Sequence, residues 1–120
     1  MEVKTYHNLN LDYLNLMTDG DASMKKMMLD ILFEELPVDL DWLSKYHNEK
    51  DWTNLKSVCH KLKSTLSFIG NDAMTIANMQ IESNAMQVQN LDEIPDLIEK
   101  LFHWYPIVLK ELKSYYNSLT

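Results

Sequence analysis

Residues 51–70 read DWTNLKSVCHKLKSTLSFIG. Apolar side chains recur in this segment every three or four residues, which is the period of a helix that buries one face. Asp51 is suited to cap the first turn, and Gly70 is suited to end the last one. We therefore predict a helix from Trp52 to Ile69. Its core side is formed by Leu55, Val58, Leu62, Leu66 and Ile69, flanked by Trp52, Cys59 and Thr65.

The same apolar period predicts helices on both sides of this segment. The expected ranges are Leu9–Met17, Ala22–His47, Ala73–Gln87 and Asp92–Asn117. Pro37 and Pro106 lie inside two of these ranges, and we expect each to bend its helix rather than end it, because the apolar period continues on both sides.

Each of the three longer flanking helices has one apolar side that we expect to face the core. In the helix that starts at Ala22 this side contains Met24, Met28, Ile31, Leu32, Leu36, Leu40 and Leu43. In the helix that starts at Ala73 it contains Ala73, Ile76, Ala77, Ile81, Ala85 and Val88. In the last helix it contains Ile94, Leu97, Ile98, Leu101, Tyr105, Val108, Leu112 and Tyr116.

The expected fold class is all-α: an antiparallel up-down four-helix bundle with a short extra N-terminal helix. The chain of 120 residues has only 2 glycines and 3 prolines, which is too few for the many tight turns of an all-β fold. Short polar connections between long helices favour antiparallel neighbours. We expect a single domain over residues 1–120, because this length fits one hydrophobic core.

The formal net charge of -7 disfavours nucleic acid and anionic membrane surfaces as partners. No apolar stretch approaches the ~20 residues of a transmembrane helix, and the segment from Met1 to Asn10 lacks the apolar run of a signal peptide. Cys59 is the only cysteine, so no internal disulfide can form. We expect a cytoplasmic monomer, since no uninterrupted heptad seam remains for a second copy.

His60 points almost directly away from the core side of the Trp52–Ile69 helix. An exposed histidine on a polar helix face is usually only solvated, but the neighbours of this one are suited to phosphoryl chemistry. A neutral, unobstructed imidazole can attack a phosphoryl group, and a lysine one turn away can pair with the bound group. Small serines leave room for a second protein. The residues within about 60° of His60 on the helical wheel are Thr53, Lys56, Ser57, Lys63, Ser64 and Ser67.

Three further residues are candidates for the edge of this site. Phe68 is either a partly exposed docking contact or a half-buried core residue. Gln80 and Asn84, in the following helix, are candidates for hydrogen bonds near His60.

The other reactive side chains indicate no second site. Cys59 adjoins His60, but neighbours in a helix point about 100° apart, so we expect a packed, inert thiol. His7, His47 and His103 show no ligand spacing, and we expect no metal site in this chain.

The run from His60 to Gly70 resembles the signature of histidine-containing phosphotransfer (HPt) domains, H-x-L-K-[GS] followed six residues later by Gly. The matching positions are His60, Leu62, Lys63, Ser64 and Gly70, with Ser64 in place of the commoner glycine. The segments Asp51-Trp52 with Leu55, and Glu34-Glu35-Leu36-Pro37, also resemble this family. The resemblance therefore covers residues 10 to 117, nearly the whole chain.

This resemblance implies that His60 is the phosphoacceptor and that Lys63, supported by Lys56, stabilises the phosphoryl group. Ser57, Ser64, Ser67 and Phe68 would line the site and contact the partner. Domains of this family are not enzymes: they accept a phosphoryl group from the aspartate of one receiver domain and pass it to another. The expected partners are the receiver domains of response regulators and of a hybrid histidine kinase. Because the receiver supplies Mg²⁺, no cofactor of this chain's own is expected.

Two alternatives stay open at this point. The chain is also similar to the phosphoacceptor domain of a chemotaxis-type histidine kinase, which carries a related His-x-x-Lys helix. A third interpretation is a helical interaction module that is never phosphorylated, and its partner binding would be indifferent to His60→Ala.

Overall fold

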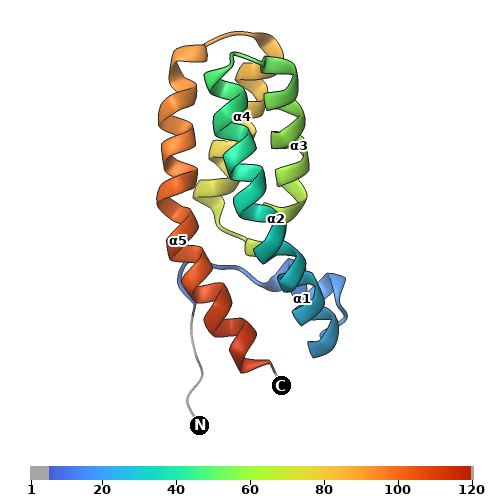
Figure 1. Ribbon diagram of the computed structural model, residues 1–120. Helices are drawn as coiled ribbons and strands as arrows, with labels where there is room; N and C mark the ends of the chain where they lie inside the picture. The colour runs from blue at the N-terminus through green and yellow to red at the C-terminus, as the bar shows by residue number, and fades with distance from the viewer. Residues whose placement is uncertain (1–5, 120) are drawn as a thin grey trace.

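The computed structural model describes residues 6–119, and every regular element in this range is helical (Figure 1). The elements in chain order are α1 (Asp12–Met17), α2 (Ala22–Asn48), α3 (Trp52–Ile69), α4 (Asp72–Gln87), the short 3-10 helix η1 (Leu91–Glu93) and α5 (Ile94–Ser118). The predicted all-α fold, with four long helices and a short N-terminal one, is therefore confirmed.

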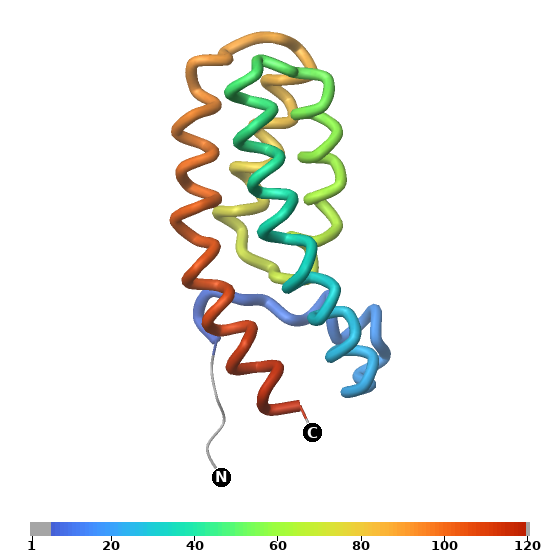
Figure 2. Tube along the Cα trace, viewed as in Figure 1, coloured from blue at the N-terminus to red at the C-terminus, as the bar shows by residue number. Residues whose placement is uncertain are grey.

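The four long helices form a bundle in which each helix packs against two neighbours. α3 packs against α2 and α4, and α5 packs against α4 and α2. Consecutive long helices run in opposite directions, and α1 lies beside one end of the bundle, where it packs against α3 (Figure 1). α2 and α5 continue through Pro37 and Pro106, and both traces curve along their length (Figure 2). No helix within residues 6–119 has the length and apolar character that a membrane span requires.

Side-chain caps begin three of the four long helices. In α2, α3 and α4 a side-chain oxygen of the preceding residue accepts a hydrogen bond from a first-turn N–H group, at 2.9, 3.2 and 3.0 Å. The capping residues are Asp21, Asp51 and Asn71. These bonds satisfy amides that the first turn of a helix otherwise leaves without partners. The cap at Asp51 and the stop at Gly70 give α3 the bounds that were predicted.

Two predicted helix starts are wrong by more than one residue. α1 begins at Asp12 instead of Leu9, because the backbone N–H of Asn10 donates to the carbonyl oxygen of Ile69 at 3.0 Å and holds this segment against the end of α3. α5 begins at Ile94 instead of Asp92, because residues 91–93 form the tighter η1 turn.

The predicted core side of α3 is confirmed, and it sets which residues this helix presents to solvent. Its members are all buried, and the most exposed of them reaches only 9%. Because α3 packs against both α2 and α4 on its core side, the opposite side of α3 is exposed to solvent. The buried residues are Leu55, Val58, Leu62, Leu66 and Ile69.

Four residues predicted for the core are exposed instead. Met24 and Ile31 of α2 are 47% and 50% exposed, while Ile76 of α4 and Val88 beyond it are 65% and 56% exposed. The apolar sides of α2 and α4 are wider than the surface that their neighbours cover, so their edges remain in water. Val88 also lies past the end of α4 in left-handed backbone (φ 50°), which takes it off the helical repeat. Met74, which was not predicted for the core, is fully buried.

Gly70 is predicted to be far less replaceable than Gly20, although both have left-handed backbone, with φ of 69° and 73°. A Cβ on Gly70 would lie 2.1 Å from the carbonyl oxygen of Asn10, whereas a Cβ on Gly20 would meet nothing within 4 Å. Gly20→Ala should therefore cost only the left-handed strain, about 1 kcal/mol of unfolding free energy. Gly70→Ala adds a steric clash and should cost about 3 kcal/mol or more. Urea unfolding of both variants measures the difference, and equal losses would contradict it.

Candidate functional site

His60 lies near the middle of α3 on its solvent side, and its side chain is 78% exposed. The helix is tied to both of its neighbours at this level. Asn78 of α4 donates from Nδ2 to the carbonyl oxygen of Cys59 at 2.9 Å, in a buried hydrogen bond. Lys61 donates from Nζ to Oδ1 of Asp39, a carboxylate of α2 that is only 5% exposed, at 3.2 Å. The residues before and after His60 are therefore held, while its own ring faces water as predicted.

Glu82 of α4 is the residue that contacts the imidazole. Its Oε2 lies 3.3 Å from Nδ1 of His60, and its side chain is 23% exposed. A carboxylate accepts hydrogen bonds, so this contact favours the tautomer in which Nδ1 carries the proton. In that tautomer Nε2 has a free lone pair and is the nucleophilic nitrogen.

Sequence reasoning missed Glu82, because nothing in the local pattern of α4 marks it. A usable signal exists in the pairing of the two helices. His60 and Glu82 are equally far in sequence from Asn71, at the turn that joins α3 to α4. Residues placed in this way about a short turn lie opposite one another in an antiparallel helix pair.

The two predicted lysines flank His60 along the exposed side of α3. Lys63 lies three residues after it and is exposed, and Lys56 lies four residues before it and is partly buried. Helical residues at these spacings are neighbours on the surface. A group bound to the ring would therefore have an ammonium group on either side along the helix.

The predicted serines have small side chains that leave space around the ring of His60. Ser57 and Ser64 are exposed, and Ser67 is partly buried. The hydroxyls of Ser57 and Ser67 donate to backbone carbonyls of α3 itself, at 3.1 and 2.9 Å. These side chains therefore lie against their own helix and leave space above it.

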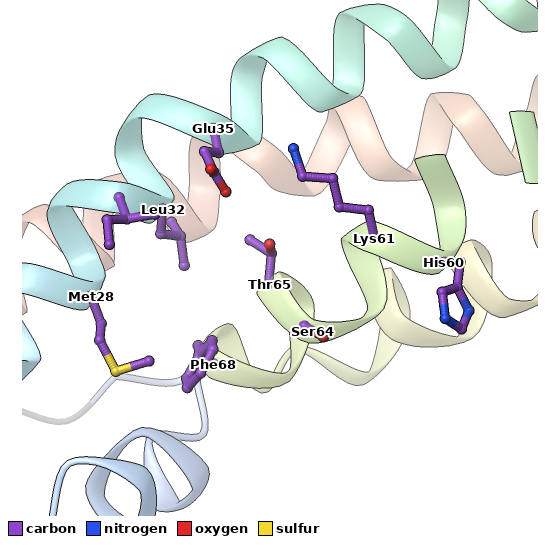
Figure 3. A pocket seen from close by; sticks show the side chains of 9 residues that line it. Met28, Leu32, Glu35, His60, Lys61, Ser64, Thr65 and Phe68 are labelled. Carbon is purple, nitrogen blue, oxygen red and sulfur yellow. The ribbon is translucent and has the colours of Figure 1, made fainter. Parts of the chain in front are cut away.

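A groove with a volume of about 380 Å³ runs between α2 and α3 and has His60 on its lining (Figure 3). Residues of α2, most of them apolar, form one side of the groove, and residues of α3 form the other. Glu35 and Lys61 place one charge of each sign on it. The lining residues are Met28, Ile31, Leu32, Glu35, His60, Lys61, Ser64, Thr65 and Phe68.

Phe68 combines the two roles that the sequence left open. It is partly buried against the hydrophobic core, and its ring lies 5.2 Å from the ring of Tyr13 in α1. It also lines the groove, where Figure 3 shows the side chain of Met28 reaching toward it.

The prediction that Gln80 and Asn84 hydrogen-bond near His60 is wrong. Gln80 donates to the side-chain oxygen of Asn84 at 2.7 Å. Asn84 in turn donates to the carbonyl oxygen of Asn90 at 3.2 Å, in the segment between α4 and α5. These two amides therefore brace the α4–α5 connection, because Asn84 is turned toward the core side of its helix.

The remaining histidines lie apart from His60. His7 and His103 are exposed, and His47 is partly buried, with its ring 6.1 Å from that of Trp52. Within residues 6–119, no three His, Cys, Asp or Glu side chains come together in a group that could hold a metal ion.

Cys59 is predicted to be chemically inert in the folded protein. The thiol is fully buried, and this burial, aided by the charge of Glu82, raises its pKa from 9.0 to about 12. The thiolate is the nucleophile that attacks a disulfide reagent, so labelling of the folded chain at pH 8 should be at least about a hundredfold slower than labelling of the urea-unfolded chain. Between pH 9 and 12 only the unfolded thiol ionises, so stability should fall as pH rises through that window. Equal labelling of folded and unfolded chain would contradict the burial.

Glu82→Ala is predicted to release His60 from its preferred tautomer. ¹⁵N NMR at a pH where the ring is neutral measures the ratio of the Nδ1–H and Nε2–H tautomers. The Nδ1–H to Nε2–H ratio should fall about fivefold in the variant, because a partly exposed hydrogen bond to a carboxylate is worth about 1 kcal/mol. Glu99→Ala, at an exposed glutamate of α5, is the control. A ratio that stays unchanged in Glu82→Ala would show that Glu82 does not select the tautomer.

The comparisons with known proteins agree with this geometry. The protein-family model described as the Hpt domain matches residues 27–117, a range that contains α3 and α4 in full. No curated protein and no solved structure matches the chain. The matched range is well over half of the 120 residues, and it confirms the family predicted from the run His60–Gly70. The chain therefore belongs to the Hpt domain family, whose members are phosphotransfer carriers of phosphorelays and interact with receiver domains.

Proposed function

We propose that this chain carries a phosphoryl group on His60 in a multistep two-component phosphorelay. It accepts the group from the aspartate of one receiver domain and passes it to the aspartate of another. The observation that carries the proposal is the exposure of the imidazole together with the contact that its Nδ1 makes. The imidazole is 78% exposed, and its Nδ1 faces Glu82 at 3.3 Å, which leaves Nε2 as the nitrogen available to a partner.

The transfer needs no proton to leave the ring. The Nε2 lone pair attacks phosphorus of the aspartyl phosphate, the P–O bond to the aspartate breaks, and the carboxylate departs. The proton stays on Nδ1, so the phosphorylated ring is cationic, and Glu82 lies where it balances that charge. In the second transfer a receiver carboxylate attacks phosphorus, the N–P bond breaks, and the neutral imidazole is regenerated.

Lys63 is the residue proposed to stabilise the phosphoryl group, with Lys56 contributing from the other side. The group carries nearly two negative charges near neutral pH, and a lysine at i+3 is placed to pair with it. Lys61, although next to His60 in sequence, is directed to Asp39 of α2. The Mg²⁺ that transfer requires is proposed to come from the receiver domain.

The proposed partners are receiver domains of response regulators and of a hybrid histidine kinase. This chain would bind them as a cytoplasmic monomer. Ser57, Ser64 and Ser67 keep the approach to the ring open, and Phe68 lines the groove beside it. The chain is acidic overall, but α3 presents lysines around His60, so the acidic site of a receiver meets a locally favourable charge.

The proposal is tested by incubation with a phosphorylated receiver domain and measurement of acid-labile, base-stable label on the chain. We predict that His60→Gln abolishes labelling and that Lys63→Ala slows transfer about fivefold, which is the effect of losing a partly exposed ion pair. His103→Gln and Lys110→Ala remove an exposed histidine and an exposed lysine of α5 and should leave transfer unchanged. Equal label on the His60→Gln variant would falsify the proposal.

A further inference from the structure

Lys61 is a further cation beside His60 that the proposed transfer leaves unused. It lies on the other side of His60 from Lys63, because one position is about 100° around α3 in one direction and three positions are about 60° in the other. Lys61 and His60 line the same groove. The side chain of Lys61 is 55% exposed and carries its ammonium group on a flexible four-carbon chain. It could therefore turn toward a phosphoryl group on Nε2 if nothing held it.

Asp39 of α2 is the residue that holds Lys61. Its Oδ1 lies 3.2 Å from Nζ of Lys61, and its side chain is only 5% exposed. Its other oxygen, Oδ2, is buried and has no hydrogen-bond partner among residues 6–119. A buried carboxylate with a single partner is left uncompensated when that partner leaves, so Asp39 holds Lys61 more firmly than an exposed carboxylate would. Figure 3 shows the side chain of Lys61 extending toward α2 and away from the ring of His60.

We infer that Asp39 is a positioning residue, which holds the ammonium group of Lys61 away from His60 and so limits how strongly the chain stabilises the phosphoryl group. The inference rests on the proposed function and deepens it. A carrier must release the group that it receives, and each cation that pairs with phosphohistidine favours the carrier over the next acceptor. The pair of Asp39 and Lys61 has no net charge, so Lys63 is left as the nearest unpaired ammonium group. The transfer equilibrium is therefore set in part by a carboxylate that does not contact the ring.

Three variants separate the charge of Asp39 from its place in the core. Asp39→Asn removes the charge, and Asp39→Leu also removes the oxygens that could still accept from Lys61. Replacement of a buried charge by an apolar residue of similar volume is commonly tolerated. Adding Lys61→Met to Asp39→Leu then removes the released ammonium group. Asp41→Asn is the matched control, because Asp41 is an exposed carboxylate of the same helix whose charge acts on Tyr105 of α5.

The probe is phosphoramidate, a small donor that requires no docking. The Nε2 lone pair of His60 attacks its phosphorus, the N–P bond of phosphoramidate breaks, and ammonia leaves. At fixed concentrations of phosphoramidate and ammonium chloride, ³¹P NMR measures the equilibrium ratio of phosphorylated to free His60. This ratio reports how strongly the folded chain stabilises the phosphoryl group, and it does not depend on the affinity of any partner protein.

We expect the ratio to rise about threefold in Asp39→Leu, because the phosphoryl group gains one partly exposed ion pair. Asp39→Asn should raise it in the same direction. The ratio should return to that of the unaltered chain in Asp39→Leu with Lys61→Met, and Asp41→Asn should leave it unchanged.

An unchanged ratio in both Asp39 variants, or an equal rise in Asp41→Asn, would overturn the inference. A rise that persists after Lys61→Met would also overturn it, because Asp39 would then act without Lys61. A chain that phosphoramidate labels on His60 but that no phosphorylated receiver labels would instead overturn the proposed function.

Discussion

The burial of one face of α3 controls the geometry of the whole site. Leu55, Leu62 and Ile69 are completely buried, and each such side chain contributes about 1.5–3 kcal/mol relative to an exposed position. Any rotation of the helix that turned His60 inward would bring these side chains into water. Asn78 adds a buried hydrogen bond to the carbonyl oxygen of Cys59, which further restricts that rotation. The exposure of His60 is thus a consequence of core packing on the far side of its own helix.

The turn between α3 and α4 supplies the second constraint. Gly70 adopts left-handed backbone where Asn10 passes too closely for any side chain, so the chain reverses at one defined residue. Asn71 then caps α4, which begins directly. This short reversal sets the register of the two helices and places Glu82 opposite His60.

The lysines around His60 show how packing assigns different roles to similar residues. Lys61 and Lys63 are two positions apart in sequence, yet they point to different sides of α3. Lys61 crosses to α2 and pairs with the buried carboxylate of Asp39, which would otherwise be an unpaired charge in the core. Lys63 remains on the exposed side with His60. Lys61 therefore helps to hold α3 against α2, whereas Lys63 stays exposed beside His60.

The helices, the bounds of α3 and the outward direction of His60 could all be predicted, because they follow from periodicity and caps within a single helix. The exposure of Met24 and Ile31, the turning of Asn84 toward the core and the contact of Glu82 could not. Each depends on which surfaces of α2 and α4 their neighbours cover and on the register across a turn. The local sequence pattern predicts that a helix has an apolar side, but it does not predict how much of that side the neighbouring helices cover. The amino-acid sequence alone was enough to predict α3 and the exposure of His60. The groove beside His60 and the contact of Glu82 with its ring depend on the packing of separate helices, so they follow only from the tertiary structure.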